Sequence, residues 1–151
     1  MLKILHFILL LLLLAGCGGQ DSSTNPSNDH ADFIQLSTNE APIEQQESNQ
    51  AKALLGKQDG LTHVYAVNSD KKMIVAFEIE HLKRFQLKDY EKKITKQIKK
   101  EFPNMEVTIS TDKKIVIEVD QLEQKMNSDS MSKKELDKEL KKLIKLSKEK
   151  T

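Results

Sequence analysis

The sequence predicts an α+β fold, a two-layer sandwich in which two helices cover one face of a four-stranded antiparallel sheet. Three observations predict it. Residues 62–67 and 73–79 are rich in strand-forming side chains, residues 87–102 repeat apolar positions at helical spacing, and a second pair of strand-like runs follows at 106–110 and 115–119. The order αββαββ gives each apolar face a partner.

The first half of this domain begins with a short helix and continues as a hairpin. Ala51, Leu54 and Leu55 lie on one helical face, and the following Asp59-Gly60 ends the helix. Turn-forming and charged residues at 68–72 then separate the two strand-like runs, as expected of a hairpin.

The second half of the domain repeats the first. Its helix carries an apolar stripe, and Pro103-Asn104 stops it. Residues 68–75 align without a gap on residues 110–117, which predicts a second hairpin around 111–114. The stripe consists of Leu87, Tyr90, Ile94, Ile98 and Phe102.

The predicted register places the core side chains on one face of the sheet. Two sets alternate there: Tyr65, Val67, Met73, Val75, Phe77 and Ile79 in the first hairpin, and Val107, Ile109, Ile115, Ile117 and Val119 in the second. Ile74, Ala76 and Val116 then lie on the second face, where we predict a candidate partner surface. The alternative is that a C-terminal helix covers this face.

The first sixteen residues are predicted to be a signal peptide. Lys3 precedes an apolar run at 4–14, which is followed by Ala15 and Gly16. At about 1.5 Å per residue this run spans roughly half of a ~30 Å hydrocarbon core. It is too short for a comfortable transmembrane helix.

Cys17 is the only cysteine in the chain, so no intramolecular disulfide is expected. Leu14-Ala15-Gly16-Cys17 resembles the lipobox of bacterial lipoproteins. That resemblance implies that a diacylglyceryl group carrying acyl chains such as palmitate is attached to the Cys17 thiol. It also implies that cleavage before Cys17 makes this residue the mature N-terminus.

Residues 17–49 are predicted to be the lipidated cysteine and a disordered polar tether, followed by the folded domain at 50–122. Residues 18–50 contain six acidic residues and no Lys or Arg. The remaining 17 acidic and 23 basic residues of the mature chain give the rest a net charge of +6. The expected arrangement is an acidic tether before a basic body.

Residues 123–151 are predicted to be a linker and a basic amphipathic helix. Ser132 and Glu135 have the spacing of a capping box. One interpretation is that the lysines of this helix face anionic lipid. The other is that its narrow apolar stripe docks on the body or on another copy. The stripe consists of Leu136, Leu140, Leu143, Ile144 and Ser147.

The sequence gives no candidate catalytic residue, metal site or cofactor site. His63 and His81 stand outside any recognisable nucleophile motif, and Glu78 and Glu80 share a strand face from which His81 points away. Gly-rich phosphate loops and Cys/His metal spacings are absent from the sequence. We therefore expect neither enzymatic activity nor a nucleic-acid partner.

The domain resembles the YhcN/YlaJ sporulation lipoproteins of endospore-forming Firmicutes. The resemblance rests on Cys17, the polar tether and three segments of the domain, namely 63–67, 73–79 and 107–114. It implies a lipid-anchored protein on the extracytoplasmic side of a forespore or spore membrane, linked to spore assembly or germination, with no assigned catalytic activity. The resemblance does not cover the tail after Leu122.

Two functions from different classes are consistent with these features. The first is a non-enzymatic structural or interaction protein that binds a protein or cell-wall partner, with the membrane contacted through the diacylglyceryl-Cys17. The alternative is a binding module for a small ligand or germinant signal beside a membrane receptor.

Overall fold

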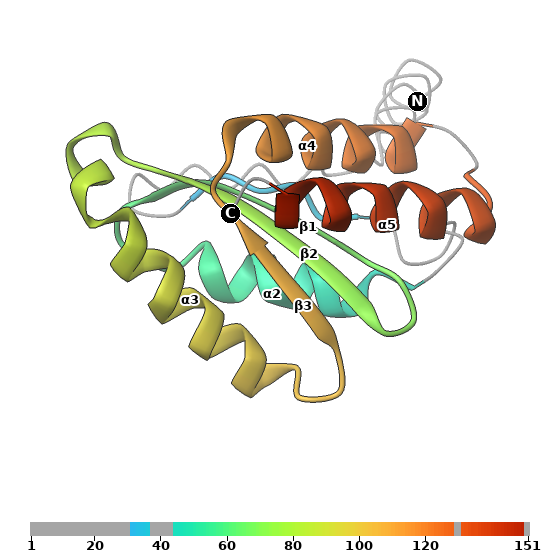
Figure 1. Cartoon of the computed structure of the whole chain (residues 1–151), viewed down its shortest axis with the longest axis horizontal. Coiled ribbons are helices and arrows are strands. Elements are labelled where there is room, and N and C mark those ends of the chain that lie inside the picture. The colour runs from blue at the N-terminus through green and yellow to red at the C-terminus, as the bar shows by residue number, and fades with distance from the viewer. Residues whose placement is uncertain (1–30, 37–43, 129–130, 150–151) are drawn as a thin grey trace, which may run out of the picture.

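The computed structural model describes residues 31–36, 44–128 and 131–149. This part of the chain contains both helices and strands (Figure 1). The elements are α2 (Gln46–Leu55), β1 (Leu61–Asn68), β2 (Lys72–Ile79), the 3-10 helix η2 (His81–Gln86), α3 (Leu87–Glu101), β3 (Glu106–Ser110), α4 (Lys113–Ser128) and α5 (Lys133–Glu149).

The strands form a mixed sheet in the order β1-β2-β3. β1 and β2 are antiparallel, and β3 runs parallel to β2. α4 and α5 pack on one face of the sheet, and α2 and α3 pack on the other (Figure 1). The predicted two-layer sandwich with a four-stranded antiparallel sheet is therefore wrong. In the described residues a three-stranded mixed sheet lies between two layers of helices.

The second predicted hairpin does not form, because its last strand is part of helix α4. Asp112 precedes this helix, and its Oδ1 accepts hydrogen bonds from the backbone N–H groups of Lys114 (2.9 Å) and Ile115 (3.1 Å). A side-chain acceptor in this position satisfies the first free N–H groups of a helix. The segment that aligns with the β1–β2 turn thus starts a helix.

β3 pairs with β2 instead of with a fourth strand. Met73 lies opposite Val107, and Val75 lies opposite Ile109. The chain reaches β3 through η2 and α3, and a crossover of this length allows the two strands to run parallel.

The register of the β1–β2 hairpin also differs from the prediction. Val67 pairs with Ile74, and Tyr65 pairs with Ala76. Directly paired residues share a face, so Tyr65 and Val67 lie on the face opposite Met73 and the other odd-numbered residues of β2.

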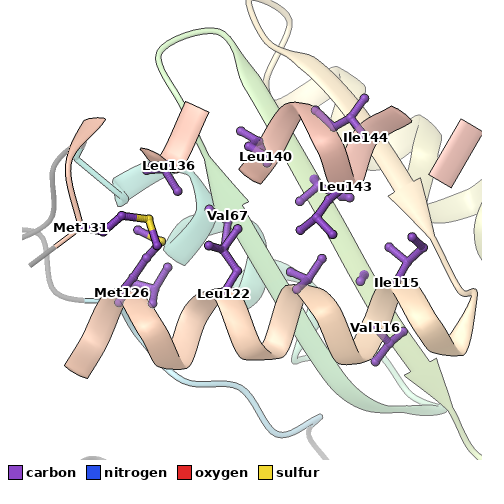
Figure 2. Packing of buried hydrophobic residues seen from close by; sticks show 14 residues of the cluster. Val67, Ile115, Val116, Leu122, Met126, Met131, Leu136, Leu140, Leu143 and Ile144 are labelled. Atoms are coloured by element: carbon purple, nitrogen blue, oxygen red, sulfur yellow. The ribbon is translucent and has the colours of Figure 1, made fainter. Parts of the chain in front are cut away.

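Both faces of the sheet are covered by apolar side chains. Under α4 and α5, Val67 and Ile74 belong to one cluster with the buried residues of these two helices. Figure 2 shows Val67 among the helix residues of this cluster. On the other face, Phe77 lies in a second cluster with residues of α2 and α3. The main residues of the first cluster are Ile115, Val116, Leu122, Met126, Leu136, Leu140, Leu143 and Ile144.

Helix α5 packs on the body through the predicted stripe, whose five residues are all buried. Figure 2 shows Leu140 and Leu143 directed toward the strands and α4. The capping box is confirmed, because the Ser132 N–H donates to Glu135 Oε2 (2.9 Å) and the Glu135 N–H donates to Ser132 Oγ (3.3 Å). The predicted domain boundary at 122/123 falls inside α4.

Candidate functional site

The residues predicted from sequence as a partner surface lie in the interior. Ile74 and Ala76 are fully buried on β2, and Val116 is buried on α4. The helices α4 and α5 cover this face of the sheet; the alternative interpretation expected the C-terminal helix α5 there, but not α4. The predicted lipidation residue, Cys17, and the predicted signal peptide at 1–16 lie outside the described residues.

The polar residues at the end of β2 do not converge on a site. His63 Nδ1 lies 3.2 Å from Glu78 Oε2, and both side chains are well exposed. Within residues 31–36, 44–128 and 131–149, no three His, Cys, Asp or Glu side chains are placed to share a metal ion.

A buried ion pair, which the sequence did not predict, joins α2 to α4. Lys52 Nζ lies 3.0 Å from Glu123 Oε1, and neither side chain has any exposed surface. Glu123 Oε1 also accepts a hydrogen bond of 2.7 Å from the backbone N–H of Ala66 in β1. Lys52 additionally donates to the backbone oxygen of Ile34. The pair therefore connects three layers of the fold with the segment before α2.

Burial dominates the electrostatics of this pair. Glu123 Oε2 is buried and has no hydrogen-bond partner among the described residues. Burial raises the pKa of Glu123 to about 7, against the opposing effect of Lys52. Burial likewise lowers the pKa of Lys52. For both groups the loss of hydration on burial therefore outweighs their mutual attraction and their hydrogen bonds.

Side chains and a short segment cover the outer edge of β1. The N–H of Val64 donates to the Asp32 oxygen (3.0 Å), that of Ala66 to Glu123, and that of Asn68 to Gln45 Oε1 (3.1 Å). An uncovered edge strand pairs readily with other chains. Among the described residues this edge is closed, so it is not a docking edge.

Residues 31–36 form the segment that covers the start of β1, and we call them the strap. The strap makes a parallel bridge between Asp32 and His63. Its end is held by Asn49, whose side chain accepts from the Leu36 N–H (2.8 Å) and donates to the Leu36 oxygen (2.7 Å). These residues belong to the predicted tether, and they fix its middle part to the body.

The 3-10 helix η2 exposes two large apolar side chains. Leu82 is 82% exposed and Phe85 is 83% exposed. The turn itself is fixed, because Lys83 Nζ lies 2.8 Å from Asp59 Oδ2 and the Tyr90 hydroxyl donates to the Asp59 oxygen (3.1 Å). With Lys83 directed toward the body, its neighbours in η2 project into solvent.

The glycine beneath η2 is required by its conformation and its surroundings. Gly60 has a φ of 87°, which favours glycine. A Cβ atom at this position would clash with the Tyr90 hydroxyl. The Gly60 oxygen also accepts a hydrogen bond of 2.9 Å from the Glu80 N–H, which sets the start of η2.

Basic side chains continue from η2 along the outer side of α3. Residues 81–101 contain eight Lys and Arg and three Asp and Glu, a net charge of +5. Ile94 and Ile98 hold the inner side of α3 against the sheet. We define the η2–α3 surface by six exposed residues: Leu82, Arg84, Phe85, Lys88, Lys92 and Lys96.

The strap begins at the same end of the sheet as η2. The Ala31 N–H donates to the Gly56 oxygen (2.9 Å), at the end of α2, and the chain from there leads within a few residues to Gly60 beneath η2. In Figure 1, η2 lies at the end of the sheet opposite the β1–β2 turn. The chain that comes from Cys17 thus enters the described body beside the η2–α3 surface.

A sequence model of the sporulation lipoprotein family YhcN/YlaJ matches residues 19–145. The chain belongs to the YhcN/YlaJ family of sporulation lipoproteins. Comparison with curated proteins gave no match, and comparison with solved structures gave none. The family match includes most of α5, which the sequence resemblance had left out.

As a member of the YhcN/YlaJ family, the protein is a lipoprotein anchored to a membrane through its lipid. None of the helices in the described residues combines the length and the apolarity that crossing a bilayer requires.

Proposed function

We propose that this YhcN/YlaJ lipoprotein is a non-enzymatic interaction protein of spore assembly or germination. It is held on the extracytoplasmic side of a forespore or spore membrane by diacylglyceryl-Cys17 and presents the η2–α3 surface to a partner there. The observation that carries the proposal is the exposure of Leu82 and Phe85 on a turn fixed by Lys83 and Tyr90.

The exposed pair gives this surface a source of binding energy. Covering a Leu or Phe side chain stabilises a complex by about 1.5–3 kcal/mol each. Both side chains lie on one short helix, three residues apart, so a single partner can cover both. Exposed apolar groups that are rimmed by charged residues are typical of interaction sites.

The strap supports the same function by fixing how the body is presented. Its backbone hydrogen bonds to β1 and its bonds to Asn49 join the middle part of the predicted tether to the fold. The position of Ala31 next to the η2 end therefore favours an orientation in which the η2–α3 surface stays near the anchor. The small-ligand alternative stays a prediction.

The test is complementation of a strain that lacks the protein. We expect the Leu82→Ser/Phe85→Ser variant to behave as the deletion does in spore yield or germination, at wild-type protein abundance. The matched control is Ile117→Ser, which replaces another exposed apolar residue, on α4. Wild-type behaviour of the double variant, or of the deletion strain itself, would contradict the proposal.

A further inference from the structure

We infer that the η2–α3 surface docks on the anionic bilayer in which the protein is anchored. This inference rests on the interaction role proposed above and names the partner. Three independent observations support it: the apolar pair at the tip, the basic charge behind it, and the point at which the chain from the anchor enters the body.

The apolar tip suits the boundary between lipid headgroups and acyl chains. Leu82 and Phe85 project from η2 at more than four-fifths exposure. Segments that insert into this boundary combine Leu and Phe side chains with Lys or Arg beside them. Here Arg84 lies between the two apolar residues in the sequence and is exposed.

The charge behind the tip is complementary to anionic lipid. The outward side of α3 carries Lys88, Lys92 and Lys96 at four-residue spacing, which puts them in one row. The net charge of residues 81–101 is +5, and within it Lys83 is paired with Asp59 and Glu80, which lie outside this range. Each basic residue near an anionic surface strengthens binding on the order of five-fold at physiological ionic strength.

The anchor keeps this surface within reach of the bilayer. Ala31 follows Cys17 by 14 residues. A chain of that length spans at most about 50 Å, so the η2 end of the body stays within that distance of the lipid. Tethering raises the effective concentration of the surface at the membrane, so even a weak contact is occupied.

The experiment uses the mature lipidated protein in vesicles of phosphatidylcholine alone or of phosphatidylcholine with phosphatidylglycerol. Gln86→Cys carries an environment-sensitive fluorophore beside the tip, and Lys141→Cys carries it on α5 as the control. We expect quenching by lipid-borne spin labels at position 86 only in anionic vesicles, decreasing as salt screens the charges. Position 141 is expected to be unaffected in both kinds of vesicle.

Two sets of substitutions identify the groups responsible. We expect Leu82→Ser/Phe85→Ser to abolish the quenching and Arg84→Gln/Lys88→Gln/Lys92→Gln to reduce the docking equilibrium on the order of 100-fold. The matched control, Lys138→Gln/Lys141→Gln/Lys145→Gln on α5, is expected to leave it unchanged. The inference would be overturned if position 86 were quenched equally in neutral and anionic vesicles, or if neither set of substitutions changed the quenching.

Failure of this inference differs from failure of the proposed function. If position 86 stays unquenched in anionic vesicles while the Leu82→Ser/Phe85→Ser strain loses function, the occupant is a protein or cell-wall partner and lipid docking is overturned. If docking is observed but the strain behaves as wild type, the proposed function is contradicted.

Discussion

Lys52 and Glu123 form a fully buried ion pair, 3.0 Å between Nζ and Oε1, that joins helices from opposite faces of the sheet. The pair lies beside the outer edge of β1, where Glu123 Oε1 also accepts a hydrogen bond from the backbone N–H of Ala66. It also holds the strap through the Ile34 oxygen. One interaction therefore joins the two helical layers, the sheet edge and the strap.

Removing one partner of this pair is expected to destabilise the protein strongly. In Lys52→Met the Glu123 carboxyl loses its counterion in the interior and must either stay charged there or take up a proton; breaking such a buried pair costs about 3–5 kcal/mol. Urea unfolding measures this as a lower midpoint at an unchanged slope.

A double variant tests whether the cost comes from the uncompensated charge. Lys52→Met/Glu123→Gln removes both charges and keeps an acceptor for the Ala66 N–H, so we expect most of the lost stability to return. Equal stability of Lys52→Met and wild type would show that the buried pair does not form.

The protonation of Glu123 predicts a pH dependence of stability. Burial raises its pKa from an ordinary value of 4.5 to about 7, so between these values the folded protein binds more protons at this carboxyl than the unfolded chain does. Its contribution is present below pH 4.5 and is lost as pH rises through about 7. We expect wild type to lose stability relative to Glu123→Gln over this range, and a parallel pH profile would contradict the shifted pKa.

Asn49 is expected to control the strap. Asn49→Ala removes two hydrogen bonds to Leu36, each worth about 1 kcal/mol. The amides of Asp32 and Val64 form the hydrogen bonds between the strap and β1. We expect their hydrogen exchange to become faster, while the α5 amides keep their rates. Gln50→Ala, at the exposed neighbouring position, is the control, and equal exchange in the two variants would show that Asn49 does not hold the strap.

Lipidation at Cys17 is expected to retain the protein at the membrane. Two acyl chains give stable anchoring, whereas the body alone makes only a surface contact. We expect Cys17→Ala to be released from the membrane fraction by a high-salt wash. Fractionation of sporulating cells measures this release. Full retention of this variant would mean that another segment is the anchor.

The overall fold was predicted wrongly, but several of its elements were predicted correctly because local patterns determine them. The hairpin of β1 and β2, the amphipathic helix α3, the strand β3 and the capping box of α5 all occur near their predicted positions. In each case one periodicity, together with a turn or cap signal, left no close alternative.

Residues 113–128 were misassigned because their apolar residues fit two periods. Ile115, Ile117 and Val119 alternate as in a strand, and their β-branched side chains favour strands. The spacing of Val119, Leu122 and Met126 fits only a helix, and Asp112 provides its cap. The helical period is clear only over the full length of α4, Lys113–Ser128, and not over the five residues that alternate.

The third layer and the candidate site had weaker signals. The unbroken apolar run at 73–77 in β2 is typical of a strand that is buried on both faces, which calls for helices on each side. The pairing of Lys52 with Glu123 depends on a contact across 71 residues, which no local pattern carries. Leu82 and Phe85 resemble core residues in sequence, and only the fold shows them exposed.

The most direct test of the account replaces Phe85 by the photo-cross-linking residue benzoylphenylalanine in sporulating cells, with the same replacement of Ile117 as the control. We predict light-dependent adducts at position 85, with lipid if the bilayer docks there, and none at position 117. A protein that is anchored at the membrane yet gives no adduct at position 85 would contradict the claim that the η2–α3 surface is where this lipoprotein meets its partner.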